Sequence, residues 1–316
     1  MRWPEKLRDS GFSIRACIKW GLAGIALFSP LLVISTLSSE FAYELRDLDK
    51  PIVFVVVLLM TSGTLYLLIS LKFRKIAHSR SCLVLVILFG LFARFGMFTS
   101  TPVLEDDHYR YLWDGGVLAN GFNPYRYSPQ EVLNKNAQHI PAALRQLAMD
   151  ADPILKRINY PWLRTIYPPV PQCAFALAHM ISPWSLPAWR VVLLTLDLVT
   201  VYIIFLILRS LGFPPIGLVV YWWNPLLIKE VFHSGHMEIV IFPFLLTAVL
   251  LSIRSKQVLA SGVLGLALGA KFWPAVLLPI VLRPLMDQPK RLMGACLLFF
   301  SVSGAMFLPF YLTGLG

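Results

Sequence analysis

Long apolar runs repeat along almost the whole sequence, and they constrain its fold more than any other feature. Several reach the roughly 20 residues that a helix needs to cross a bilayer. Only 14% of the residues are charged, against about a quarter in soluble domains. The sequence therefore predicts an all-α polytopic membrane protein. The runs cover residues 16–38, 51–71, 81–100, 167–182, 188–208, 215–229, 237–253, 258–282 and 291–311.

The run at 258–282 is long for a single span and contains Lys271 and Pro274. Proline removes a backbone donor and crowds the preceding turn, so we expect a kinked or broken helix there. The run at 167–182 is short for a span. It opens on Tyr167-Pro168-Pro169, which fits the start of a helix, where missing donors cost little.

The net charge of +11 would suggest a nucleic-acid partner in a soluble protein. Here the cations gather in short loops between apolar runs, as membrane topology predicts, so we expect no nucleic-acid binding. Two cationic segments, the N-terminus and the loop after the second apolar run, should both face the cytoplasm. This places the end of the third apolar run on the opposite side of the membrane. Their cations are Arg2, Lys6, Arg8 and Arg15 at the N-terminus, and Lys72, Arg74, Lys75 and Arg80 in the first cationic loop.

Residues 100–166 form the one long polar region, and it opens with EDDHYRYLWDGGVLANGFNPY at 105–125. Its first three residues are carboxylates that directly follow a membrane-length apolar run. Such a cluster at a membrane boundary is costly unless it is solvated or functional. Acid, aromatic and cationic residues together indicate a site that holds a sugar and a base that deprotonates it. The rest of the region predicts short amphipathic helices with proline breaks, lying along the membrane surface.

The block LEDDHYRYLWDGGVLANGFNPYRYSP, followed by INYPWLRTIYPPVPQCAFAL, resembles bacterial glycosyltransferases of the GT-C superfamily. More narrowly, it resembles the polyprenyl-phosphate-mannose-dependent mannosyltransferases of glycosyltransferase family 87. The likeness continues through HSGHME (233–238) and GLALGAKFWPAVLLPI (265–280). It implies a GT-C-like transmembrane helix bundle whose long loop, about 101–166, carries short amphipathic helices and faces the periplasm.

The resemblance also implies an inverting glycosyltransferase, a multi-pass protein of the bacterial inner membrane. The enzyme would move a hexose, with mannose expected, from a polyprenyl phosphate carrier to a lipid-linked or glycan acceptor at the periplasmic face. Its partners would be this donor, the acceptor and membrane lipids. We expect no required cofactor, and the need for a divalent cation stays open.

We divide the chain into residues 1–80, an N-terminal two-helix membrane segment, and 81–316, the catalytic membrane module. Family members are usually longer than this chain, which stops at FLPFYLTGLG. We therefore expect the module to be incomplete at its C-terminus.

Inversion needs a carboxylate that takes the proton from the attacking acceptor hydroxyl. The family pattern has an acidic pair in this loop, and we assign Asp106 as the base and Asp107 as its companion. The companion would orient the acceptor or bind a cation. Spacing alone does not separate the two roles, and a solvated loop cluster is the alternative. Glu105 is expected to be a bystander.

Lys271, Arg110 and His236 are assigned to the donor phosphate. Lys271 lies within an apolar run, where a lysine is costly unless it meets an anion or snorkels to the interface. In the family, the matching lysine lies near the donor phosphate. Arg110 fits either a phosphate or an ion pair with Asp106 or Asp107, because its planar fork matches both kinds of anion.

Tyr111, Trp113 and Glu238 are assigned to the sugar or the acceptor, since aromatic rings stack on sugars and carboxylates accept from hydroxyls. Glu238 and His236 belong to HSGHME, in which His233 is a second histidine. Two histidines and an acid could ligate a metal, but the signal is weak and the zincin spacing is absent. We assign no metal ligand, and a turn without function is the alternative.

Two other classes of protein fit the apolar pattern. A polytopic transporter or lipid flippase would show as many helices, but such proteins carry internal repeats and midplane sites, and we detect no repeat here. A non-catalytic, truncated remnant is the third interpretation. Tryptophans near helix ends, Trp222 and Trp223 among them, fit an interfacial belt.

Overall fold

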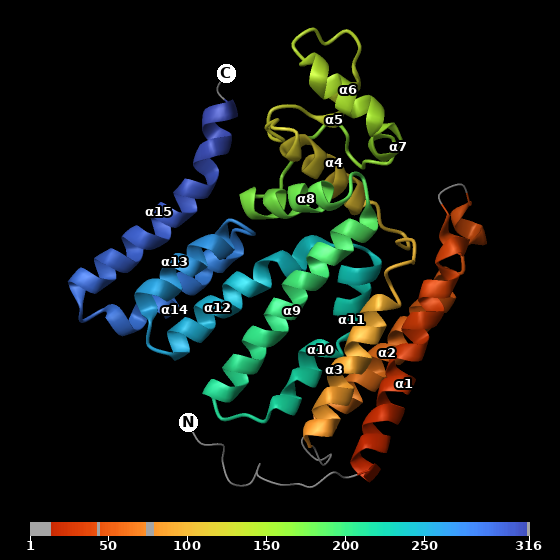
Figure 1. Cartoon of the computed structure of the whole chain (residues 1–316), viewed down its shortest axis with the longest axis vertical. Coiled ribbons are helices and arrows are strands. Elements are labelled where there is room, and N and C mark those ends of the chain that lie inside the picture. The colour runs from red at the N-terminus through yellow and green to blue at the C-terminus, as the bar shows by residue number, and fades with distance from the viewer. Residues whose placement is uncertain (1–13, 43–44, 74–78, 315–316) are drawn as a thin grey trace. The chain divides into compact units, whose positions relative to one another are not determined.

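The computed structural model describes residues 14–42, 45–73 and 79–314, in which helices make up all of the regular structure (Figure 1). Helices that are long and apolar enough to cross a membrane cover Ile14–Phe41, Ile52–Lys72, Leu186–Ser210 and Pro289–Gly314. These spans confirm the prediction of a polytopic helical protein. The predicted orientation stays a prediction, because Arg2, Lys6, Arg8, Arg74 and Lys75 lie outside the described residues.

The chain packs as two units, each of which is described by itself. The first unit combines residues 1–104 with 204–234, and the second combines residues 105–203 with 235–316. Helix α9 runs through the change of unit at residue 203 without a break. We predicted a division of the chain at residue 80 from the family resemblance and not from packing. That division stays a prediction.

In the first unit, α1 packs against α2 and α3 (Figure 1). The helices of this unit are α1 (Ile14–Thr36), η2 (Leu37–Phe41), η3 (Asp47–Asp49), α2 (Ile52–Lys72), α3 (Arg80–Phe95), η5 (Pro215–Leu218), α10 (Val219–Trp222), α11 (Pro225–Leu227) and the π-helix η6 (Ile228–His233).

Two tryptophans form the centre of this unit's core. Trp222 and Trp223 are fully buried, and both indole N–H groups donate to backbone carbonyls of α3. Trp223 meets the rings of Trp20 and Phe28 edge-on, with centroids 5.6 and 5.4 Å away. The Arg94 guanidinium lies 3.4 Å from the ring centroid of Trp222. The prediction of an interfacial belt is therefore wrong for both tryptophans, because the indole donors are satisfied inside the protein.

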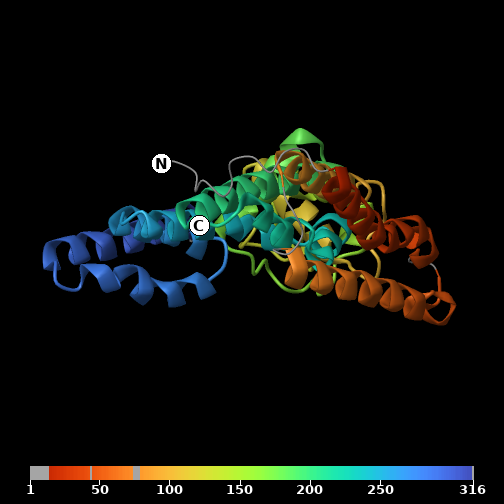
Figure 2. The same ribbon diagram turned by 90° about the horizontal axis from the view of Figure 1, so that it is seen from below.

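In the second unit, α12, α13 and α15 lie side by side (Figure 1 and Figure 2). The helices of this unit are α4 (Asp107–Ala119), α5 (Pro129–Leu133), α6 (Ala142–Asp150), α7 (Asp152–Leu155), α8 (Pro169–Ile181), α9 (Leu186–Ser210, to residue 203), η7 (Met237–Ile241), α12 (Phe242–Ile253), α13 (Gln257–Leu268), η8 (Trp273–Leu277), α14 (Leu278–Leu282), η9 (Arg283–Leu285) and α15 (Pro289–Gly314).

The predicted break in the run 258–282 is confirmed. Helix α13 ends at Leu268, and the next turn, η8, begins only at Trp273 with Pro274 in its first turn. Lys271 lies in the gap between them, so its side chain starts from a non-helical segment. The predicted helix entry at Tyr167-Pro168-Pro169 is also confirmed, because α8 begins at Pro169.

The long polar region forms a small core of its own. Helices α5, α6 and α7 pack with α4 around apolar side chains that include Trp113, Leu144 and Leu155, all nearly inaccessible to solvent. This confirms the predicted short helices with proline breaks. On its other side α4 packs against α8, most closely at Gly115, where an added Cβ would lie 2.3 Å from the Phe175 carbonyl oxygen. This core holds the start of α4 in place.

Candidate functional site

The acidic residues Asp106 and Asp107 stand at the start of α4. Asp106 is the N-cap residue, but its side chain makes no capping hydrogen bond, and Asp107 is the first helical residue and is exposed. Neither carboxylate has a hydrogen-bond or ion-pair partner among the residues that the structure describes. The positive end of a helix dipole suits two negative charges. Both carboxylates are therefore available to a ligand.

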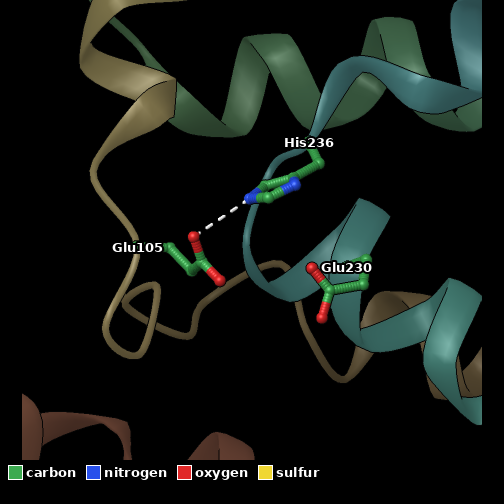
Figure 3. A group of neighbouring side chains, drawn as sticks. All are labelled: Glu105, Glu230 and His236. Atoms are coloured by element: carbon green, nitrogen blue, oxygen red, sulfur yellow. Dashed lines mark hydrogen bonds and ion pairs between the residues drawn. The ribbon is translucent and has the colours of Figure 1, made fainter.

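Four polar side chains from three separate segments of the second unit form a continuous series of contacts. The His236 Nε2 lies 3.1 Å from the Glu105 Oε2 (Figure 3). The His236 Nδ1 lies 3.8 Å from the Glu238 Oε2, and the Lys271 Nζ donates to the Glu238 Oε1 at 2.6 Å. All four side chains are partly exposed, between 22% and 48%. The structure thus brings together His236, Glu238 and Lys271, which the sequence assigned from distant segments.

Glu105 is the fourth side chain in this series of contacts, and we expected it to be a bystander with no part in the reaction. Its contact with His236 gives it a defined place at the site. Glu230, also drawn in Figure 3, belongs to the first unit.

The electrostatic surroundings of Tyr111 include Asp107 of the acidic pair and Glu238 of these polar side chains. Burial raises the pKa of the Tyr111 hydroxyl, and Tyr167, Asp107 and Glu238 raise it further. Burial likewise raises the pKa of Tyr167 to about 12, with Asp107 the next largest cause. Asp107 and Glu238 therefore both lie within electrostatic reach of the Tyr111 hydroxyl. The Tyr111 ring itself is 3% exposed and stacks on Phe175 at 4.7 Å.

Trp113, like Tyr111, is buried against other aromatic side chains. It is 2% exposed, belongs to the small core around α4, and lies nearly parallel to Trp184 at a centroid distance of 6.3 Å. Protein contacts account for both aromatic rings, and their assignment to sugar stacking stays a prediction.

Arg110 forms an ion pair with Asp114, not with Asp106 or Asp107. Its Nε lies 3.2 Å from the Asp114 Oδ1, and both side chains are almost completely buried. The Arg110 Nη2 also donates to the backbone carbonyl of Leu163. We expected Arg110 either to bind a phosphate or to form an ion pair with Asp106 or Asp107. The structure shows an ion pair, but its partner is Asp114, one helical turn further along α4. Its assignment to the donor phosphate stays a prediction.

His233 has both of its ring nitrogens engaged within the first unit. Its Nδ1 lies 2.8 Å from the Ser100 Oγ, and its Nε2 accepts the Val103 N–H at 3.2 Å. A neutral ring that donates from Nδ1 satisfies both contacts. His233 is therefore not available as a metal ligand beside His236.

His108 is a residue that sequence reasoning missed. It follows Asp107 directly, is 4% exposed, and its Nδ1 is buried with no hydrogen-bond partner among the described residues. Burial lowers the pKa of its imidazole to about 3, and Arg190, Arg157 and His236 act in the same direction. A buried, neutral imidazole thus directly follows the acidic pair in the chain. Its place within the acidic block was the one available signal.

Residues 22–286 match a protein family that is described as alpha-(1->6)-mannopyranosyltransferase, N-terminal domain. Comparison with curated proteins and with solved structures gives no match. The matched range includes every residue of the site described above, and the spanning helices agree with a membrane glycosyltransferase. The predicted likeness to mannosyltransferases is confirmed. The chain belongs to the alpha-(1->6)-mannopyranosyltransferase N-terminal domain family.

Proposed function

We propose that the protein is an inverting mannosyltransferase that takes mannose from a polyprenyl phosphate carrier. The acceptor would be a lipid-linked sugar or a glycan at the periplasmic face of a bacterial inner membrane. One observation carries this proposal: Asp106 and Asp107, two carboxylates with no partner among the described residues, occur in the same unit as the Glu238–Lys271 ion pair, and Asp107 and Glu238 both raise the pKa of Tyr111.

Lys271 is suited to the donor end of the reaction. Its ammonium group is anchored by Glu238 at 2.6 Å, and its side chain stays 33% exposed, so an incoming phosphate can reach it. When the bond between the anomeric carbon and the phosphate oxygen breaks, the electron pair stays on the phosphate. A positive charge placed beforehand stabilises that developing charge. Glu238 keeps the lysine in place before the donor binds.

The acidic pair is suited to the acceptor end. As the acceptor oxygen attacks the anomeric carbon from the face opposite the phosphate, a carboxylate takes the hydroxyl proton. The sequence favours Asp106 as this base. The structure adds an argument for Asp107, which is exposed and whose charge raises the pKa of both Tyr111 and Tyr167. We propose that the pair supplies the base, and that transfer needs no added metal because Lys271 provides the positive charge.

The test is mannose transfer in membranes that contain the full chain. Radiolabelled polyprenyl-phosphate mannose and extracted envelope lipids would be supplied to wild type, Asp106→Asn and Asp107→Asn. General base catalysis contributes about 10²- to 10⁴-fold, so we expect a loss of at least about 10²-fold in one of the two variants. Asp152→Asn is the matched control, since Asp152 is a half-exposed residue of the same loop and its side chain pairs, among the described residues, with Lys156 alone.

Wild-type transfer by both variants would refute the assignment of the base. Loss of transfer in a metal chelator, restored by a divalent cation, would refute the metal-free mechanism and leave the enzyme class intact.

A further inference from the structure

Helix α8 has an exposed face that is apolar. Leu177, Met180 and Ile181 are exposed, Met180 to 74%, and so is Cys173, whose thiol behaves as a small apolar group. In a helix with 3.6 residues per turn, successive spacings of four, three and one residues place these four side chains on one side. The opposite side of α8 is buried and packs against α4. The described residues thus leave one apolar face of α8 uncovered.

The segment before α8 displays two further large apolar side chains from a backbone that is held in place. Trp162 and Ile166 are both exposed, Ile166 to 75%. Between them, the Leu163 carbonyl accepts a hydrogen bond from the buried Arg110. Directly before them, the Pro161 carbonyl accepts a backbone N–H of α5 at 2.9 Å. Residues 162–181 therefore present their apolar side chains outward from an ordered backbone, and we call these side chains the outward surface.

The outward surface leads directly into a spanning helix of the same unit. Helix α8 ends at Ile181, and α9, which is long and apolar enough to cross a membrane, begins at Leu186. Phe175 in the middle of α8 meets Trp189 in the first turn of α9, with ring centroids 5.1 Å apart. Helix α8 therefore lies at the level where α9 enters the membrane.

Helix α8 is itself too short to be a span. Its 13 residues cover about 20 Å, against a hydrocarbon core of about 30 Å. It packs along α4, and Figure 1 shows it diverging from α9 instead of running beside it. The other short helices of the loop, α5, α6 and α7, turn their apolar sides into the small core around Trp113. The free apolar face at this membrane boundary thus belongs to α8.

We propose that α8 lies in the plane of the membrane interface, with the outward surface in contact with lipid. A helix with one apolar face outward binds a bilayer by burying that face at the boundary between headgroups and acyl chains. Trp162 is a residue type common at this depth. Along the chain, the outward surface continues into exposed apolar side chains of α9 such as Leu198, and these meet lipid in a spanning helix. This continuity selects lipid over a protein partner.

This placement fixes the depth of the acidic pair. The buried side of α8 holds α4 through the close approach of Gly115 to the Phe175 backbone, and α4 begins at the acidic pair. With lipid on one side and α4 on the other, α8 keeps Asp106 and Asp107 at the bilayer surface. The inference does not rest on the proposed transfer reaction, because it uses only the spanning helix and the outward surface.

The test places a nitroxide spin label on the full chain in liposomes of phosphatidylethanolamine and phosphatidylglycerol. It measures how often the label collides with oxygen, which concentrates in lipid, and with a water-soluble nickel complex. The labels are attached to Leu177→Cys, Met180→Cys and Ile166→Cys, one at a time, in a chain whose four native cysteines are replaced by alanine. Leu198→Cys in α9 is the lipid control, and Gln146→Cys on the exposed side of α6 is the water control.

We expect the three labels of the outward surface to behave like the label at position 198. Their ratio of oxygen to nickel collisions should be several-fold higher than at position 146. Frequent nickel collisions at positions 177 and 180 would show that water covers this face, and would overturn the proposal. Few collisions with either reagent would show that protein covers it, a second copy of the chain for example, and would overturn lipid as the occupant.

A second measurement applies if the chain without cysteines does not fold. A residue that carries a photoreactive diazirine replaces Leu177 in the otherwise native chain, and Leu198 in the control. Illumination in the same liposomes should give lipid adducts at position 177 in a yield close to that at position 198. Adducts with protein at position 177, or no lipid adduct there while position 198 forms them, would overturn the proposal.

Discussion

The contact between α4 and α8 at Gly115 gives the sharpest prediction about what supports the site. The helices approach so closely there that an alanine Cβ would lie 2.3 Å from the Phe175 carbonyl oxygen and 2.5 Å from its carbonyl carbon. Both neighbours are backbone atoms, so no side-chain rotation can relieve the overlap. Gly115→Ala must therefore push the two helices apart.

The magnitude follows from that distance. Bringing the Cβ to 3.0 Å from the carbonyl oxygen, the shortest separation that real Cβ atoms show, requires a shift of about 0.7 Å. Overpacking of this kind costs about 1–3 kcal/mol. Alanine offsets up to about 1 kcal/mol of it through its better helix propensity. Because the overlap is with rigid backbone, we expect a cost in the upper half of that range, about 2–3 kcal/mol. Subtracting about 1 kcal/mol leaves a net loss of about 1–2 kcal/mol, which lowers the melting temperature by a few °C.

Tryptophan fluorescence during heating of the detergent-purified protein measures this change, because Trp113 and Trp184 lie near the contact. Two glycines serve as comparisons. Gly304→Ala, in α15 with nothing within 4 Å, should melt no lower than wild type. Gly116→Ala meets the tip of the Trp184 ring at 2.3 Å, which a ring movement can relieve, so its loss should be smaller. If Gly115→Ala melts with wild type while Gly304→Ala behaves as expected, the close approach of α4 and α8 is wrong.

Three further predictions concern charged groups. Lys271→Gln should lower mannose transfer by about 10²-fold without shifting the melting temperature, because its ion pair with Glu238 is partly exposed and contributes little stability; a large thermal shift would contradict this. Arg110→Met should destabilise the protein by about 3–5 kcal/mol, because it leaves the buried Asp114 carboxylate without its cation, although the hydrogen bond from the Gln172 amide stays in place. The double variant Arg110→Met, Asp114→Leu should melt higher than the single variant, so equal melting of the two would refute the buried pair. In the folded protein the pKa of His108 is lowered from its ordinary value of 6.5 to about 3. Between these two pH values the unfolded chain binds a proton at His108 that the folded protein does not bind. The free energy of unfolding should therefore fall as the pH drops from about 6.5 towards 3, by up to about 1.4 kcal/mol per pH unit. Melting curves of His108→Gln should depend less on pH over that range than those of wild type, and identical slopes would count against the buried neutral imidazole.

The long helices and two of the breaks could be predicted from the sequence, because apolar run length and proline are local signals, whereas the division of the run 215–229 into η5, α10 and α11 was not predicted. The break around Lys271 and the start of α8 at Pro169 both followed from such signals. The burial of Trp222 and Trp223 could not be predicted in this way. A tryptophan near a helix end has the same local sequence whether its N–H meets water at the interface or a carbonyl of a neighbouring helix. The structure supplies those carbonyls from α3, 135 and 137 residues earlier in the chain.

The three adjacent carboxylates show the same limit within the candidate site. From the sequence, Glu105, Asp106 and Asp107 are equivalent acids at a membrane boundary, and only the family pattern separated them. In the structure the backbone changes direction between them, because Glu105 precedes the helix, Asp106 is its N-cap and Asp107 opens its first turn. Consecutive residues at such a bend point into different surroundings. Glu105 therefore meets His236, 131 residues away in sequence, while the two aspartate carboxylates have no partner in the part of the chain that the structure describes. A base must be able to reach the acceptor hydroxyl, so the acid that the fold ties to a histidine is the weakest candidate of the three, and the acidic pair is the strongest.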